Sequence, residues 1–234
     1  MAINIAPGPA RQAGLLYLVV VLAGIISLAY VPSQLFVHGN AEQTVANIAA
    51  STGLFRLGIA AGFVCYLAFL LLPFAFYRLL GHAHRGAAVL MVAFAVVSVP
   101  ISLGNMVNKL DVLTLLDGAS VLAGTTSPDV QAAVMRSLAR YNNGILVAEL
   151  FWGLWLLPLG YLVLKSRMLP SLLGVLLIAG CFGYLTDVFA TVLFPSWSTS
   201  TAARFVTAPA SFGEIGTCLW LLVFGVRESA RRAD

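Results

Sequence analysis

The sequence predicts an all-α integral membrane protein, a bundle of six transmembrane helices with short interfacial helices on its outer side. Hydrophobic residues make up 60% of the 234 residues and charged residues only 9%, against roughly 45–50% and about 25% in soluble domains. Apolar runs of about 20 residues, long enough to cross roughly 30 Å of hydrocarbon, occur six times. The alternating strands of a membrane barrel are absent, so the pattern favours helices as the spanning structure.

The six runs follow one another without a soluble domain, and we expect residues 1–234 to form a single transmembrane domain. The predicted spans lie near 14–36, 54–79, 87–108, 143–164, 170–194 and 207–226. The first run is too long for the apolar part of a signal peptide, and no small-residue cleavage site stands clear of it before Pro32. We therefore expect this run to remain in the membrane as a span.

The distribution of Lys and Arg predicts the orientation of the chain. Eight basic residues flank the side that carries both termini and the loops 80–86 and 165–169, and five flank the other side. Because cytoplasmic loops carry the excess of basic residues, we expect a bacterial cytoplasmic (inner) membrane protein with both termini in the cytoplasm. This bias accounts for the net charge of +4, so no nucleic-acid partner is expected; membrane lipids are the expected surroundings.

The segments on the outer side are longer than the cytoplasmic turns and are predicted to be structured. In residues 40–52, Val45 and Ile48 fall on one helical face, as in a helix that lies on the membrane surface. Residues 111–123 repeat this pattern. These two segments are the predicted interfacial helices.

The fourth span is predicted to bend. A helix that begins after an N-cap at Ser127 and runs unbroken to Leu164 would be about 55 Å long, more than the bilayer needs. Residues 142–144, with the sequence Asn-Asn-Gly, are poor helix formers, so we place the bend there. Further kinks are expected at the prolines inside spans, which are Pro73, Pro100 and Pro158.

Three acidic side chains, Glu149, Asp187 and Glu214, fall inside the predicted spans. Ionisable groups at the bilayer centre commonly cost a few kcal/mol each and are therefore functional candidates. Counted from the middle of each span at about 1.5 Å per residue, all three lie in the outer half. Because they come from three different helices, their shared depth predicts a common site.

Other polar and aromatic side chains lie at the same level as these acids. By helical spacing, Asn142 and Trp152 share a face with Glu149, and Tyr184 shares one with Asp187. The further candidates, on the second and third spans, are Arg56, Tyr66 and Asn105. Five helices therefore direct polar groups inward at one level, which predicts a pocket open to the outer leaflet or to the outside water.

The chemistry of this layer leaves two interpretations open. Three carboxylates close together in a low dielectric cannot all stay ionised, so at least one is expected to hold a proton at neutral pH. Arg56 or Lys109 could neutralise another. Such a set could perform acid–base catalysis through Glu149, Asp187 and Glu214, bind a cation, or bind a polar head group. The alternative is an internal network of salt bridges and hydrogen bonds that holds the helices together.

A metal site is not predicted. His38 stands at the outer end of the first span, where it could complete a metal site with the three acids. A single histidine without a ligand-spaced partner is nevertheless a poor metal signature. The sequence identifies neither a cofactor nor an oligomeric state.

Four stretches of the chain resemble a bacterial membrane family catalogued as domain of unknown function 4386. They are "RQAGLLYLVVVLAGI", "LFRLGIAAGF", "LFWGLWLLPLGYLVLKSRMLPSLLGVLLIAGCFGYL" and "APASFGEIGTCLWLLVFG". The arginine of "FRLG" and the glutamate before the last "WLL" are typical of the family and correspond to Arg56 and Glu214 here. The resemblance implies a six-helix bundle and brings no assigned activity.

The leading hypothesis is an inner-membrane protein whose outer-half pocket binds, or binds and transforms, a small amphipathic or lipid-like molecule. The carboxylates would supply acid–base or head-group contacts, Arg56 a balancing charge, and Trp152 and Tyr184 an aromatic wall. A second hypothesis is a proton- or cation-coupled transporter, which lacks a polar path through the apolar inner half. A third is a non-catalytic membrane subunit or chaperone, whose acids would pair with Arg56 and Lys109 and leave no cavity. The sequence does not decide whether the protein is an enzyme.

Overall fold

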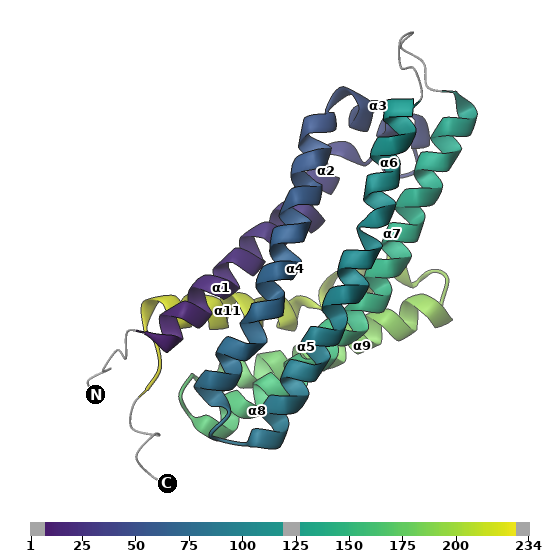
Figure 1. The fold of residues 1–234 in the computed structure, drawn as a ribbon. Helices are drawn as coiled ribbons and strands as arrows, with labels where there is room; N and C mark the ends of the chain where they lie inside the picture. Colours follow the sequence, from purple (N-terminus) through teal and green to yellow (C-terminus); the bar gives the residue numbers. More distant parts are fainter. Residues whose placement is uncertain (1–7, 119–126, 228–234) are drawn as a thin grey trace.

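The computed structural model describes residues 8–118 and 127–227, and within them the chain is helical without a β-strand (Figure 1). Six stretches are long and apolar enough to cross a membrane. They are Pro9–Leu35, Thr52–Leu80, Arg85–Asp117, Pro128–Ser166, Ser171–Leu193 and Thr201–Val223. The predicted all-α fold with six spans is therefore confirmed, and the protein is a multi-pass membrane protein.

Four of the six spans consist of helical segments that continue one another along the chain. The first span contains α1 (Pro9–Gly24), the π-helical turn η1 (Ile25–Tyr30) and α2 (Val31–Leu35), and the second is α4 (Thr52–Leu80). The third contains α5 (Arg85–Asn105) and α6 (Val107–Gly118), and the fourth contains α7 (Pro128–Leu154) and α8 (Leu156–Ser166). The fifth is α9 (Ser171–Leu193), and the sixth contains α10 (Thr201–Val206) and α11 (Ala208–Val223). Between spans lie α3 (Ala41–Ala50) and the 3-10 turn η2 (Trp197–Thr199).

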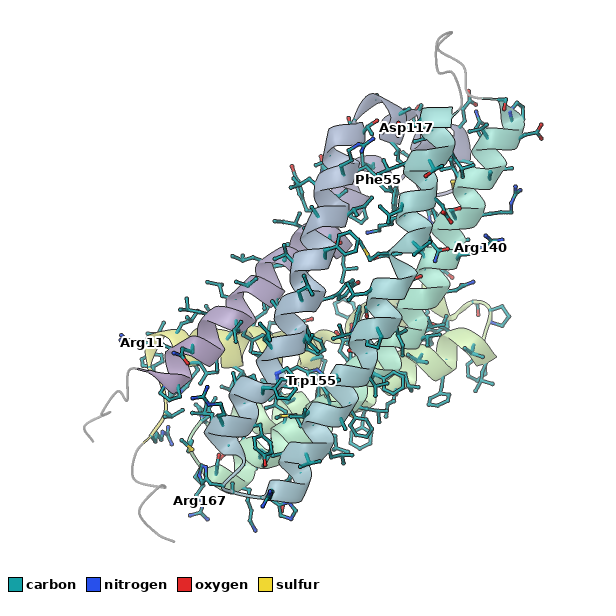
Figure 2. The ribbon with its side chains drawn as sticks, viewed as in Figure 1. Arg11, Phe55, Asp117, Arg140, Trp155 and Arg167 are labelled. Carbon is teal, nitrogen blue, oxygen red and sulfur yellow. The ribbon has the colours of Figure 1, made fainter. Side chains whose placement is uncertain are left out.

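The two ends of the bundle carry different connections. The start of α1, the end of α11, the α4–α5 turn and the α8–α9 turn lie toward one end, and α3 lies with the start of α7 at the other (Figure 1). At the first end the Arg227 amide donates a hydrogen bond to the Met168 carbonyl, 3.1 Å away. Figure 2 shows Arg11 and Arg167 at this end and Asp117 at the opposite one.

The interfacial helix predicted at 40–52 is present as α3. Its Val45 and Ile48 are fully buried in a core cluster of the protein and Glu42 is exposed, so the helix and its apolar face are confirmed, and its position on the membrane surface stays a prediction. The predicted helix at 111–123 is not separate, because α6 begins at Val107 and continues the third span. Its last predicted residues, 119–123, lie outside the described residues.

The bend predicted at 142–144 is wrong, since α7 runs through these residues without interruption. Tertiary packing explains this result. The Asn105 side chain donates a hydrogen bond to the Tyr141 carbonyl at 2.8 Å and lies directly against Gly144, where a Cβ atom would collide with it. Neighbouring contacts therefore override the weak helix propensity of this short segment.

Proline instead adjoins irregularities of the first and fourth spans. The fourth span breaks at Trp155, between α7 and α8, because Pro158 lacks an N–H and its ring crowds the carbonyl of the residue four positions earlier. The first span widens into the π-helical turn η1 just before Pro32. Pro73 and Pro100, in contrast, lie inside the continuous helices α4 and α5.

Two clusters of buried side chains form the core. The first cluster joins α1, α5, α8, α9, α11 and the second half of α4, and contains Tyr17, Phe76 and Trp155. The second cluster joins the end of α1, α2, α3, α6, α7 and the first half of α4, and contains Phe55 and Met106. Trp152 packs against both clusters. Figure 2 shows Phe55 and Trp155 at their two different levels in the bundle.

Small residues bring α9 and α11 close together. A Cβ atom at Gly180 would lie 2.5 Å from the Ala210 Cα atom and 2.7 Å from its Cβ atom. Since distances below about 3 Å are not tolerated between such atoms, the two helices could not keep this separation with any larger residue at position 180. Close approach through small residues is a usual basis of helix packing in membranes.

We predict that Gly180→Ala lowers the melting temperature, because overpacking costs typically 1–3 kcal/mol, roughly the size expected here. Gly104→Ala is the matched control, since no heavy atom lies within 4 Å of the Cβ position there. The control should keep or raise the melting temperature, because Ala favours a helix over Gly by about 1 kcal/mol. Thermal unfolding of the two variants in detergent measures the difference. Equal melting temperatures would contradict the packing described here.

Candidate functional site

A cavity of about 310 Å³ lies where the two core clusters meet. Its walls come from the first, second, fourth, fifth and sixth spans. The lining residues are Tyr17, Val20, Val21, Gly24, Ile25, Leu28, Ala29, Cys65, Tyr66, Phe69, Trp152, Trp155, Tyr184, Ser211, Glu214 and Ile215. The cavity is therefore mostly apolar and aromatic, with few polar groups, as is usual for small-molecule sites.

Glu214 is the only charged side chain among the described residues that line this cavity. The Tyr17 hydroxyl donates a hydrogen bond to Glu214 Oε1 at 3.0 Å. Tyr17 itself is 1% exposed, and its ring lies edge-on to Phe76 and Trp155 at centroid distances of 5.7 and 6.2 Å. These ring contacts fix the hydroxyl, and the hydroxyl in turn fixes the carboxyl group at the cavity wall.

Aromatic rings make up much of the remaining wall. The Tyr66 ring stacks on Trp152 with a centroid distance of 6.2 Å and an interplanar angle of 28°. Phe69 lies edge-on to Trp155 at 5.0 Å. Since these side chains come from α4 and from the end of α7, the break at Trp155 occurs at the level of the cavity.

The cavity opens sideways, between the first and sixth spans. Its rim contains Ile25, Leu28 and Ile215, whose exposed fractions are 49%, 39% and 40%. Exposed apolar side chains in the middle of a span face hydrocarbon, so the opening leads into the lipid. The π-helical turn η1 supplies this part of the rim, and such turns are frequent at functional sites.

The other two predicted acids lie beside this wall. Glu149 and Asp187 are both half-buried and close enough to repel each other electrostatically. Tyr184 lies within electrostatic range of Glu149, Asp187 and Glu214. The Trp197 Nε1–H donates a hydrogen bond to Asp187 Oδ1 at 2.7 Å, so a residue outside the predicted spans holds this carboxylate.

No arrangement suited to a metal ion is found among residues 8–118 and 127–227. In particular, no three His, Cys, Asp or Glu side chains of this part of the chain come together as a ligand set. His38 is exposed at the end of the first span.

The expected neutralisation of these acids by Arg56 is not found. The Arg56 Nη2 atom lies 3.3 Å from Asp117 Oδ2, and the two side chains are 55% and 66% exposed. The reason is distance along the helix, because Arg56 is ten residues from Tyr66 and therefore roughly 15 Å above it. An ion pair this exposed stabilises the fold by at most about 1 kcal/mol.

Lys109 does not pair with the acids either. It is 2% exposed, its Nζ atom donates to the Ser27 carbonyl at 3.4 Å, and it lies 4.2 Å from the centroid of the Tyr141 ring. Arg56–Asp117 is the one ion pair among the side chains that the structure describes. The third hypothesis, in which Arg56 and Lys109 neutralise the three acids, therefore lacks its expected pairs.

The predicted binding residues fall into two groups. Tyr66, Trp152 and Tyr184 line the cavity together with Glu214. The residues that lie elsewhere are Arg56, Asn105 and Asn142. Asn105 ties α5 to α7 through the Tyr141 carbonyl, and Asn142 is exposed. Residues that share a helix face in sequence thus do not all share a site, because α7 extends beyond the level of the cavity.

Sequence reasoning missed several residues of the wall, above all Tyr17 and Trp155. Tyr17 is a single polar-tipped ring in an apolar run, which is a weak signal by itself. Its partner Glu214 is 197 residues away, and helical spacing carries no information across that separation. The proline three positions after Trp155 was the available signal, because it predicts the local break that turns this ring inward.

The model of the family described as "Domain of unknown function (DUF4386)" matches residues 12–225. The chain belongs to the DUF4386 family. No curated protein and no solved structure matches it. Every residue of the cavity wall falls inside the range that matches DUF4386, so the site is built within the family domain itself.

We predict that Arg56→Gln in this DUF4386 protein changes the melting temperature by no more than about 2–4 °C, the shift that corresponds to roughly 1 kcal/mol in a chain of this size. Asp117→Asn should behave in the same way, because it removes the other half of the same exposed pair. Thermal unfolding of both variants checks this expectation. A much larger effect of Arg56→Gln alone would show a role for Arg56 beyond its contact with Asp117.

Proposed function

We propose that the protein binds a small amphipathic or lipid-like molecule in the lateral cavity. The polar end of the ligand lies beside Glu214, and its apolar part follows the aromatic wall and leaves through the opening between the first and sixth spans. The observation that carries this proposal is the position of the Glu214 carboxyl group, the one charged group among the described lining residues of a cavity that opens to hydrocarbon.

Energetics support a binding role for this carboxyl group. Placing an ionisable side chain within the membrane commonly costs a few kcal/mol of free energy, roughly as much as several good contacts contribute. The Tyr17 hydroxyl is the only hydrogen-bond partner of Glu214 among the described residues, and it contacts only one of the two carboxyl oxygens of this cavity-lining residue. A ligand with a polar end would satisfy the other oxygen. If the protein also transforms its ligand, Glu149 and Asp187 are the further acidic groups near Tyr184 of the cavity wall.

The alternatives receive less support from the same contacts. A purely structural role for the acids would favour salt bridges with Arg56 and Lys109, whereas Arg56 contacts Asp117 and Lys109 contacts Ser27. A coupled transporter would need polar groups on both sides of the cavity. The first core cluster, on the side of the α8–α9 turn, is instead filled by large apolar side chains such as Phe76 and Leu159.

We further propose that the protein resides in a bacterial cytoplasmic membrane with both termini in the cytoplasm. The basic residues Arg11 and Arg167 lie at the end of the bundle where the first span begins and the last one finishes (Figure 2). Under the positive-inside rule this end faces the cytoplasm. The cavity itself lies near the middle of the first, second and sixth spans, rather than in the outer half that the sequence predicted.

We predict that Glu214→Gln reduces the amount of amphipathic molecule that co-purifies with the protein while the melting temperature stays within about 2–4 °C, equivalent to roughly 1 kcal/mol. Gln keeps the shape and can still accept the Tyr17 hydrogen bond, and the loss of a buried charge removes a desolvation cost. Mass spectrometry of extracts from protein purified with native lipid measures the bound molecule.

Glu42→Gln is the matched control for this experiment, since it makes the same chemical change at an exposed position on α3. The control should retain the wild-type amount of bound molecule. A Glu214→Gln protein that melts at a higher temperature and retains its full complement of bound molecule would favour the structural interpretation of the acids.

The proposed orientation predicts that a cysteine at position 38 reacts with a membrane-impermeant thiol reagent in whole cells and that a cysteine at position 82 does not. Both His38 and His82 are exposed, so the two introduced cysteines are equally accessible in the folded protein. A difference in labelling between His38→Cys and His82→Cys therefore reports which side of the membrane each position faces. The native cysteines Cys65, Cys181 and Cys218 are buried and should contribute little background. Labelling at position 82 alone would reverse the orientation.

A further inference from the structure

We infer that the polar end of the ligand is a positively charged ammonium group attached to an alkyl chain, without a phosphate. This inference deepens the proposed function and rests on it, because it names the charge class of the molecule in the same cavity. Three features of the wall carry it, namely the sign of its charge, its aromatic composition and the position of the basic residues elsewhere in the bundle.

The first feature is that the wall is acidic. Glu214 lines the cavity and, among the described lining side chains, no Lys, Arg or His accompanies it. Behind the wall, Tyr184 lies within electrostatic range of Glu149 and Asp187 as well as Glu214. A carboxyl group in so apolar a site is neutralised either by a proton or by a cation. A ligand cation can therefore replace the proton and form an ion pair with Glu214.

The second feature is the aromatic wall. The cavity is lined by the rings of Tyr17, Tyr66, Phe69, Trp152, Trp155 and Tyr184. Ring faces attract cations through their quadrupole, tryptophan most strongly, with a contribution of roughly 2 kcal/mol when the cation is desolvated. Aromatic rings that share a cavity wall with one carboxylate are suited to ammonium groups, including quaternary ones that cannot donate hydrogen bonds.

The third feature is that the basic residues lie elsewhere in the bundle, and this excludes a phospholipid head group as the ligand's polar end. A zwitterionic lipid brings a phosphate next to its amine, and a buried phosphate needs Arg, Lys or a set of N–H donors. The two basic side chains that the sequence placed near this level are engaged elsewhere, Arg56 with Asp117 and Lys109 with Ser27 and Tyr141. A phosphate in the cavity would face Glu214 without a cation, so a simple alkylamine or alkylammonium ion fits better.

The test compares four amphiphiles by isothermal titration of the full-length protein in a maltoside detergent. The first three share an eight-carbon chain and differ in their polar end: octyltrimethylammonium, octanol and octanoate. The fourth is lysophosphatidylethanolamine, which adds the phosphate. Titrations into protein-free micelles subtract partition into the detergent. The same series on Glu214→Gln, with Glu42→Gln as the matched control, assigns the charge preference to one carboxyl group.

We expect octyltrimethylammonium to bind at least about tenfold more tightly than octanol, and octanoate and the lysophospholipid to bind more weakly than the ammonium ion. Glu214→Gln should remove this preference, so that octyltrimethylammonium binds no more tightly than octanol. Equal affinities for the three octyl compounds, or a preference for octanoate, would overturn the inference while the proposed function stands. Lysophosphatidylethanolamine binding as tightly as the ammonium ion would overturn the exclusion of phosphate.

Failure of the proposed function gives a different result. In that case none of the four compounds binds beyond its partition into empty micelles, although the protein remains folded by its melting temperature. The selectivity of the wild-type protein decides the inference even if Glu214→Gln does not fold.

Discussion

The hydrogen bond from Tyr17 to Glu214 closes the helical bundle. It joins the first span to the last across 197 residues at 3.0 Å, and the Cys218 thiol adds a contact of 3.7 Å to the Gly14 carbonyl one turn away on each helix. A polar group within hydrocarbon has to find its partner inside the protein, because no water is present there to replace it. The position of α1 against α11, and with it the shape of the cavity, depends on this pair.

Two irregular helical segments contribute to the cavity wall. The π-helical turn η1 forms part of the rim, and the break between α7 and α8 carries Trp155 into the wall. Both irregularities adjoin a proline, Pro32 in the first span and Pro158 in the fourth. Proline frees backbone groups and widens or interrupts a helix. Space between membrane helices thus arises here from local backbone chemistry, with large side chains on either side.

Buried charges of opposite sign are kept apart in this fold. Lys109 is buried beside Tyr141 of the second core cluster, with a carbonyl and this aromatic ring as its partners. Glu214 lies at the boundary of the first cluster with a hydroxyl as its partner. Direct pairing would have neutralised both groups and removed any charge preference from the cavity. Their separation leaves the cavity acidic, which is why we propose an ammonium ligand for it.

The sequence by itself determined the fold class and the spans, because hydrophobic length and the scarcity of charge are properties of local composition. It also indicated Glu214, since a carboxylate in an apolar run is unusual wherever it faces. Only the tertiary structure decided which side chains share the site. Tyr17 joins Glu214 through a contact between the two ends of the chain. Arg56 lies too far along its helix and binds Asp117, and α7 continues without interruption through 142–144, where Asn105 packs against it. Spacing along one helix fixes a face, but the partner of that face depends on how separate helices pack, and packing is a property of the whole bundle.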